Sequence, residues 1–450
     1  MRFAYLSELL FWRIPAMKKI YDDDRWYSVL RNIVDLYIHR SYKKYRCVGL
    51  EKIPGDGAVI FSPNHCDALM DPFAVLAMNR DKKVFVARAD IFRKPAIRKI
   101  LTFLKIMPIT RVRDGFRNVL DTNDTIEKSI EVLNNRVPFC ILPEGTHRSM
   151  HSLLPLGKGI SRIALGAHRS SPDGRHVYIV PIGCEYGDYY RYRSTLLLTI
   201  GDPIDVSAFI DAHPEKSDPE LLSGIRSLTA EAMKQQIVWI PDDGDYEATW
   251  ELAKLQSGRV PECRLQARLD ANRTAAAKLD RLRAEKPAAA ASLFEKATRW
   301  MEARRQARVS LHATYTRHPL LSALWRTFKG LVTLPFALVY ALVSAPAWGV
   351  GEKLAAGVED RTFRNSFRCC ALILIWTLEV LIAAIVLLST MKWYWALLAL
   401  VLLLPAPQLT YDWFEQMRRL ASAWRWACHP KLRARHDDLT NELNETLNNI

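Results

Sequence analysis

A histidine and an aspartate six positions apart are the first residues in this chain that could do chemistry. His65 follows residues 58–61, an apolar run of strand length, so we expect it where a buried strand emerges into a loop. Asp71 precedes Pro72, which makes it the expected N-cap of a helix over residues 72–78. The two side chains should face each other across a short loop. A carboxylate held against one imidazole nitrogen leaves the other nitrogen free to act as a general base.

A phosphate site is suggested by a second stretch, LPEGTHRSMHSLLPLGKG. Glu144 follows an expected strand, so its carboxylate should be partly buried and paired with a nearby arginine or with substrate hydroxyls. Thr146 and the backbone N–H groups of the turn can complete that pairing. Lys158 lies between two glycines at an expected helix start, where free N–H groups and the helix dipole favour an anion. A simply solvated lysine is the alternative. Arg111, at the end of another expected strand, is the first choice for a bidentate phosphate contact, with Arg113 as its more exposed rival.

Other reactive side chains near these motifs have plainer explanations. A single proton transfer needs no second base, so we interpret His147 and His151 as polar loop residues or substrate contacts. Cys66 is adjacent to His65, but neighbouring residues point different ways, and a buried thiol is a better interpretation than a nucleophile.

The order of these motifs resembles that of a known family. An NH followed by an acid, then PITR ending at Arg111, then PEGT with a downstream LPLGKG, then VPIG at 180–183, resembles the four blocks of the glycerol-phosphate and lysophosphatidate acyltransferase superfamily. The resemblance runs from about Val48 to Pro203. It implies that His65 is the base on the acceptor hydroxyl, that Asp71 orients it, and that the later blocks bind the acceptor's phosphate. The implied substrate-binding set is Arg111, Glu144, Gly145, Thr146, Arg148 and Lys158.

Two positions depart from the common pattern of that family. Five residues separate His65 from Asp71 where four are usual, and this longer spacing resembles the branch that acylates glycerol-3-phosphate or dihydroxyacetone phosphate. His147 stands directly after PEGT, where an arginine is usual, and Arg148 follows it. The longer spacing also motivates an alternative from another class, a catalytically inactive lipid-binding or scaffolding protein.

Composition favours a membrane partner over nucleic acid. The 450 residues carry a net charge of +15, but the cations are interleaved with acids and lack a compact run of aromatic residues. An anionic membrane surface explains the same charge. The 8 cysteines show neither a disulfide framework nor metal-ligand spacing, which indicates reduced thiols. No metal or cofactor is implied beyond acyl-CoA or acyl-ACP as co-substrate, and no pattern indicates an oligomeric state.

Short apolar runs alternate with helical periodicity between residues 45 and 250, which predicts an α/β domain with a mixed sheet flanked by helices. The motifs fall at strand ends and helix starts, where such domains place their ligands. Expected strands cover 58–61, 83–87, 106–109, 139–142, 176–180 and 196–200, and expected helices cover 72–78, 97–104, 116–133 and 159–167. Residues 1–44 are expected to form amphipathic or interfacial helices.

The rest of the chain is expected to be helical. Residues 251–310 form a charged arm with one apolar edge, made of Leu265, Leu269, Ala276, Leu279 and Leu282. Residues 311–450 are a membrane-anchoring region with hydrophobic segments at 331–350, 371–389 and 393–409. The loop before the third segment has a single cation, whereas both outer flanks are rich in them, which places the last two segments as a hairpin and the catalytic domain on the cytoplasmic side. The first segment, with Pro335 and Pro346, could be re-entrant or interfacial.

The sequence therefore predicts a membrane-bound acyltransferase of phospholipid biosynthesis. It would move a fatty acyl group from acyl-CoA or acyl-ACP to a hydroxyl of glycerol-3-phosphate, dihydroxyacetone phosphate or lysophosphatidate.

Overall fold

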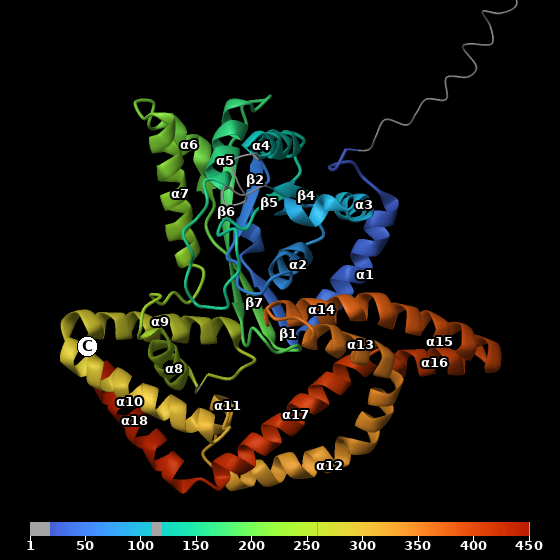
Figure 1. Cartoon of the computed structure of the whole chain (residues 1–450), viewed down its shortest axis with the longest axis vertical. Helices are drawn as coiled ribbons and strands as arrows, with labels where there is room; N and C mark the ends of the chain where they lie inside the picture. The colour runs from blue at the N-terminus through green and yellow to red at the C-terminus, as the bar shows by residue number, and fades with distance from the viewer. Residues whose placement is uncertain (1–18, 110–118, 259, 450) are drawn as a thin grey trace, which may run out of the picture.

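A mixed β-sheet forms the centre of the first half of the chain (Figure 1). The computed structural model describes residues 19–109, 119–258 and 260–449, and in these ranges the sheet has 8 strands in the order β1-β7-β6-β2-β5-β3-β4, with β8 paired to β6. Strands β6, β2, β5, β3 and β4 run parallel, whereas β7 is antiparallel to β6 and parallel to β1. The predicted mixed sheet is confirmed. The strands are β1 Lys44–Val48, β2 Ala58–Pro63, β3 Val84–Arg88, β4 Ile106–Ile109, β5 Phe139–Cys140, β6 Val177–Tyr186, β7 Thr195–Ile200 and β8 Ile204–Asp205.

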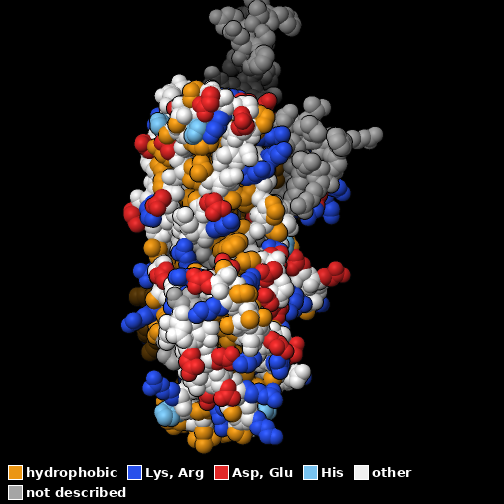
Figure 2. All heavy atoms as spheres, turned by 90° about the vertical axis from the view of Figure 1, so that its left-hand side faces the viewer, with side chains coloured by type: hydrophobic (Ala, Val, Ile, Leu, Met, Phe, Trp, Pro, Cys, Tyr) orange, Lys and Arg blue, Asp and Glu red, His pale blue; other side chains and the backbone are white. Residues whose placement is uncertain are grey.

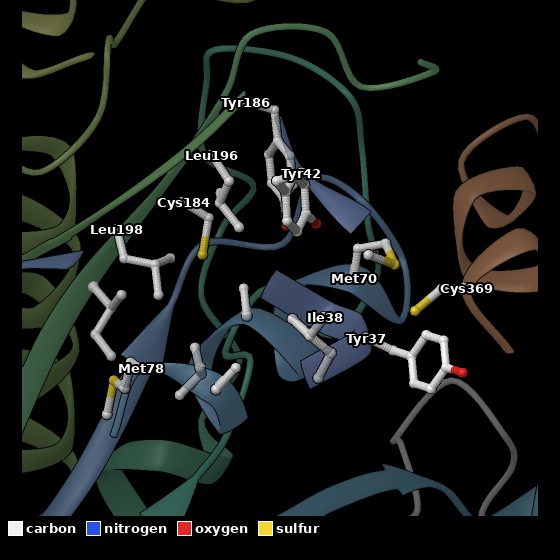
Figure 3. Packing of buried hydrophobic residues seen from close by; sticks show 14 of the residues in the cluster. Tyr37, Ile38, Tyr42, Met70, Met78, Cys184, Tyr186, Leu196, Leu198 and Cys369 are labelled. Carbon is white, nitrogen blue, oxygen red and sulfur yellow. The ribbon is translucent and has the colours of Figure 1, made fainter. Parts of the chain in front are cut away.

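Strand β2 is buried along its whole length because helices cover both faces of the sheet. Its side chains alternate between two clusters, since successive residues of a strand point to opposite faces. Val59 and Phe61 pack toward α1 (Arg25–Ser41) and α2 (Met70–Ala77), while Ala58 and Ile60 belong to the cluster of the opposite face. That second face is covered by α4 (Val119–Asn134), α5 (Gly159–Arg169), α6 (Val206–Asp211) and α7 (Asp218–Lys234). Figure 3 shows part of the first cluster, with Tyr42, Met70, Cys184 and Tyr186 around its upper end. The stretch that begins at Asn64 thus follows a strand that packing holds from both sides.

Strand β1 was not predicted, and it begins at the end of the stretch, residues 1–44, that was expected to form helices. It pairs in parallel with β7 at one edge of the sheet, and its side chains are half-buried or exposed. Charged residues suit such an edge because they disfavour pairing with another chain.

A helical arm follows the α/β domain and packs with the end of the chain. It consists of α8 (Tyr246–Ser257), α9 (Leu265–Glu285) and α10 (Pro287–Gln306), and the C-terminal helix α18 (Pro430–Asn448) packs against α8, α9 and α10. The five residues of the predicted apolar edge are all buried. On the face that α7, α9 and α10 present, cations and acids are interspersed (Figure 2). The arm is therefore an ordinary packed bundle with a solvated outer surface.

Three helices between the arm and α18 are long and apolar enough to cross a membrane: Pro319–Val343, Phe363–Thr390 and Trp393–Ala427. They comprise α12 (Pro319–Val343), then α14 (Phe363–Ala371) continued through a π-helical turn (Leu372–Trp376) into α15 (Thr377–Thr390), and lastly α16 (Trp393–Leu403) with α17 (Ala406–Ala427). Large apolar side chains lie exposed along α12, α15 and α16. In Figure 1, α15 and α16 form a projecting hairpin, and α12 lies beside α17.

The predicted position of the first hydrophobic segment was wrong. The helix breaks at Ser344, which ends α12 and precedes α13 (Ala345–Ala356), so residues 331–350 are shared between two helices. Pro346 lies in the first turn of α13, where a missing N–H is tolerated, whereas Pro335 is accommodated inside α12. The segment 371–389 lies within the apolar helix Phe363–Thr390, and the segment 393–409 lies within Trp393–Ala427, where it crosses the break between α16 and α17. The expected interfacial helix near the N-terminus falls mostly within residues 1–18, which lie outside the described residues.

Candidate active site

The carboxyl ends of three adjacent parallel strands carry the residues of the candidate site. His65 follows β2, Glu144 follows the neighbouring β5, and Tyr186 ends β6 on the other side of β2. Because parallel strands end at the same edge of a sheet, residues distant in sequence meet there.

The predicted contact between His65 and Asp71 is present. Nδ1 of His65 lies 2.8 Å from Oδ2 of Asp71, with the Asp71 side chain fully buried and the His65 side chain 16% exposed. An ionised carboxylate at Nδ1 selects the tautomer that carries its proton there. Nε2, which has no hydrogen-bond partner among the described residues, is then the basic nitrogen.

Asp71 was predicted to be the N-cap of α2. This prediction was wrong, because the helix begins one residue before Asp71, at Met70. The Asp71 carboxylate instead gathers donors from the loop before the helix. Oδ2 accepts the backbone N–H groups of Cys66 and Asp67 at 2.7 and 2.8 Å, in addition to the imidazole. Oδ1 accepts the buried hydroxyl of Tyr186 at 2.7 Å. These donors fix the carboxylate and compensate for its burial.

The backbone of His65 is clamped by the PEGTHR loop. Its N–H donates to Oε1 of Glu144 at 2.7 Å, and its carbonyl accepts the backbone N–H of Arg148 at 3.0 Å. The preceding Asn64 makes a two-way contact with β6, since its Oδ1 accepts the N–H of Cys184 at 2.6 Å and its Nδ2 donates to the Cys184 carbonyl at 3.4 Å. The two motifs found in the sequence therefore position a single residue.

The Glu144 carboxylate accepts hydrogen bonds from two backbone segments and pairs with no arginine among the described residues. Its second oxygen accepts the N–H of Leu154 at 2.8 Å. Burial raises the pKa of this carboxyl to about 7, even though the N–H groups of Leu154 and His65 lower it. The expected arginine is not its partner, whereas backbone N–H groups, which were expected to complete the pairing, supply both of these hydrogen bonds because the loop folds back on itself.

The rest of the PEGTHR loop is shaped by one glycine. Gly145 has a φ of +69°, which a side chain would strain, although no atom lies within 4 Å of the position of an added Cβ. Thr146 follows it and is half-buried. The guanidinium of Arg148 pairs with Asp242 and donates to the Ser152 hydroxyl at 2.7 Å, so the predicted phosphate ligand is already engaged elsewhere.

Lys158 lies where the sequence placed it, exposed at the N-terminal end of α5. The N–H of the preceding Gly157 donates to the Pro143 carbonyl at 2.7 Å, which brings this helix end beside the PEGTHR loop. Arg111 and Arg113 lie outside the described residues.

The family comparison agrees with this geometry. Residues 44–185 match the family model described as Acyltransferase. This part of the chain is an acyltransferase-family domain. The match contains the His65–Asp71 pair and the PEGTHR loop, which confirms the superfamily resemblance on which the site was predicted.

Relatives of the acyltransferase domain are similar over short stretches. Two proteins of Saccharomyces cerevisiae match: glycerol-3-phosphate O-acyltransferase 2 is 33% identical over 87 residues and glycerol-3-phosphate O-acyltransferase 1 is 39% identical over 66 residues. The aligned parts are 19% and 15% of this chain, and they span only 12% and 9% of those proteins. The crystal structure of the 1-acyl-sn-glycerophosphate (LPA) acyltransferase PlsC from Thermotoga maritima is 19% identical, covers 51% of this chain and 88% of its own, and has a TM-score of 0.34.

His147 and His151, the two histidines that the sequence analysis weighed beside His65, have different surroundings. His151 is buried, packs against Trp250 with 3.8 Å between ring centroids and the rings tilted by 41°, and lies 3.3 Å from the Tyr189 hydroxyl, which indicates a packing role. His147 faces the candidate base, with 5.3 Å between its ring centroid and that of His65. Cys66 is a buried thiol, and burial raises its pKa well above the ordinary value, which disfavours a nucleophilic thiolate.

Sequence reasoning missed three contributors to this site. Asn64 was visible as part of the NH motif but had no predicted partner. Tyr186 ends a strand that was predicted to stop at residue 180, and Asp360, which contacts His147, comes from the C-terminal half of the chain. No local pattern could have assigned the last two, because their partners are more than 100 residues away.

Proposed function

We propose that this protein is a membrane-bound O-acyltransferase that moves a fatty acyl group from a thioester carrier, coenzyme A or acyl carrier protein, to a hydroxyl of a glycerol-phosphate acceptor. The observation that carries the proposal is the free Nε2 of His65, aimed by Asp71 inside an acyltransferase-family domain. The relatives named for glycerol-3-phosphate acylation support this class of acceptor.

In the proposed reaction, Nε2 of His65 removes the proton of the acceptor hydroxyl as its oxygen attacks the thioester carbonyl. Asp71 stabilises the imidazolium that results. The C–S bond then breaks, the new ester is released, and the imidazolium returns its proton to the departing thiolate. The direct transfer needs no acyl-enzyme intermediate, which is consistent with the inert environment of Cys66.

The acceptor's phosphate would be bound by the exposed Lys158 at the start of α5 together with Arg111. Free N–H groups at that helix end favour an anion. Arg148 would join them only after releasing Asp242, because its guanidinium is already paired.

The geometry of the site weakens the argument for the alternative, a catalytically inactive lipid-binding or scaffolding protein. It rested on the longer His65-to-Asp71 spacing, which would leave the imidazole unoriented if the acid were misplaced. The 2.8 Å contact shows that the acid reaches the ring despite the extra residue.

The test is acyl transfer by the purified protein in detergent, with palmitoyl-CoA as donor and glycerol-3-phosphate, dihydroxyacetone phosphate or lysophosphatidate as acceptor. Acceptor-dependent thiol release is measured, with a correction for the exposed Cys263 and Cys428. His65→Ala should lower kcat by at least about 10³-fold, since it removes the general base and its proton transfer.

The matched control is His176→Ala, which removes another histidine held by an aspartate but far from this site, and it should leave kcat unchanged. Turnover above one tenth of wild type in a folded His65→Ala protein would remove His65 from the proposed role. Absence of acceptor-dependent thiol release in wild type, with acyl-CoA and acyl-ACP alike, would reject the activity itself.

A further inference from the structure

A short segment from the C-terminal half of the chain reaches the acyltransferase site. Between α13 and α14, Oδ2 of Asp360 lies 2.7 Å from Nε2 of His147. The ring of Phe363, the first residue of α14, packs edge-on against the same imidazole at 5.0 Å between centroids. His147 is in turn the ring that faces His65. This segment lies more than 170 residues beyond the end of the family match.

The Asp360 carboxylate is oriented before it meets His147. Its Oδ1 accepts the N–H and the hydroxyl of Thr362 at 3.0 and 2.6 Å, which leaves Oδ2 for the imidazole. Although burial raises the pKa of Asp360, the hydrogen bonds from Thr362 and His147 hold it below the ordinary value, so this group is an anion at neutral pH.

The segment is also anchored to the acyltransferase domain. Nδ2 of Asn365 donates to the Tyr189 carbonyl at 2.8 Å, and the guanidinium of Arg361 lies 4.6 Å above the Tyr190 ring. One turn further along, Cys369 is buried in the same cluster as Met70 and Tyr37 (Figure 3). The position of Asp360 over the site is therefore set by packing and not by the ion pair alone.

The contacts of His147 leave one of its ring nitrogens available to bind an anion. Nε2 donates its proton to the Asp360 carboxylate, so Nδ1, which has no hydrogen-bond partner in the described ranges, is the nitrogen left for an anion, and it can donate to that anion when the ring takes up a second proton. The other titratable group packed on His147 is His65, with Asp71 behind it, while the guanidinium of Arg148 is directed to Asp242. The His147 side chain is 18% exposed, so a ligand can reach it.

We propose that Asp360 is a positioning residue that holds the His147 imidazole as a ligand for the acceptor's phosphate monoester. The region of apolar helices then supplies part of the acceptor site of the acyltransferase domain. The proposal rests on the proposed function for its kinetic test, and phosphate binding tests it independently.

The kinetic test compares Asp360→Asn with wild type. The KM for glycerol-3-phosphate should rise about tenfold while kcat stays within threefold, because a bound phosphate loses one charge-assisted contact and the base is untouched. Asp360→Glu should recover part of the affinity, and Glu359→Gln, which removes the neighbouring exposed acid, should change neither constant.

The decisive comparison uses His147→Arg, whose charge needs no carboxylate to maintain it. In that background Asp360→Asn should alter KM by less than twofold. An equal loss in both backgrounds would mean that Asp360 acts only by holding the fold, and it would overturn the proposal.

Binding of inorganic phosphate, measured by calorimetry on the full chain in detergent, separates this proposal from the activity. Asp360→Asn should weaken binding about tenfold even if no acceptor is turned over. Unchanged phosphate affinity in Asp360→Asn would overturn the inference while leaving the proposed activity standing. A parallel rise in KM for lysophosphatidate would show that both acceptors use the same phosphate contact, whereas an unchanged KM for both acceptors would reject it.

Discussion

Two histidine–aspartate pairs in this molecule have almost the same geometry and very different surroundings. Nδ1 of His65 lies 2.8 Å from Asp71, and Nδ1 of His176 lies 2.7 Å from Asp205. The first pair stands at the carboxyl ends of the central strands with side chains 16% and 0% exposed, whereas the second stands before β6, at the opposite edge, with side chains 48% and 31% exposed.

The two carboxylates also differ in the other hydrogen bonds that they accept. Asp71 accepts from four N–H or O–H donors in two parts of the chain, residues 65–67 and Tyr186, while Asp205 is the N-cap of α6 and accepts the N–H of Ala208 at 2.9 Å. The distance between the two partners therefore does not distinguish a candidate base from a surface pair. Burial of the carboxylate and the number of its donors do.

The strongest test of this contrast replaces each acid by its amide. Asp71→Asn should lower kcat by about 10³-fold or more, because a neutral amide no longer stabilises the imidazolium and can select the wrong tautomer. Asp205→Asn should leave kcat within twofold. Initial rates of acyl transfer measure both, and equal effects from the two substitutions would contradict the distinction.

Glu144→Gln tests whether burial of the Glu144 carboxyl, which accepts the backbone N–H of His65, makes the free energy of unfolding depend on pH. The pKa of about 7 is raised above the ordinary value, so the folded protein binds this proton more tightly than the unfolded chain does. Its contribution to the free energy of unfolding is full at low pH and falls as pH rises from about 4.5 to about 7, by about 3 kcal/mol in all.

Melting temperatures at pH 5 and pH 8 measure this effect. The wild-type value should fall over that interval more than the value of Glu144→Gln, whose amide does not titrate. The exposed Glu127→Gln on α4 is the control and should follow wild type. Parallel slopes for wild type and Glu144→Gln would show that the carboxyl does not titrate in this window.

Tyr186→Phe removes one donor from Asp71 and keeps the buried ring. The loss of this hydrogen bond should lower kcat about tenfold, because the carboxylate becomes less firmly fixed and the vacated oxygen stays buried. A pH–rate profile and kcat measure it. If Tyr186→Phe had wild-type kcat, the donors to Asp71 would be structural support without influence on the base.

Asp205→Ala should have the smallest effect on turnover and a measurable effect on folding. Removing the N-cap of α6 should cost about 1 kcal/mol of stability, seen as a lower melting temperature, with kcat unchanged. Loss of acyl transfer in a folded Asp205→Ala protein would mean that the second pair also serves the reaction.

Much of the fold was predictable because its signals are local. Apolar runs of strand length gave six strands of the sheet, and the His65–Asp71 contact followed from a strand end and an X-Pro helix start only six residues apart. Strand β1 was not predictable from its cations, since its stability comes from pairing with β7, about 150 residues later.

The parts of the site that escaped prediction depend on long-range contacts. Helix α2 starts at Met70 instead of after Asp71 because the carboxylate is drawn to donors before the helix and to Tyr186. Arg148 had the right charge but found Asp242 in a turn nearly a hundred residues away. Asp360 reaches His147 across 213 positions, a distance over which composition and periodicity carry no information.

The hydrogen bond between the Ser310 N–H and the Ser422 hydroxyl, at 2.8 Å, limits how the apolar helices can sit in a bilayer. Ser310 precedes the first of the three candidate spans and Ser422 lies at the end of the third, and both flanks contribute to the same buried cluster. Three full traverses would separate these residues by the thickness of the hydrocarbon, about 30 Å. The contact between the two flanks is therefore incompatible with three full traverses by these helices.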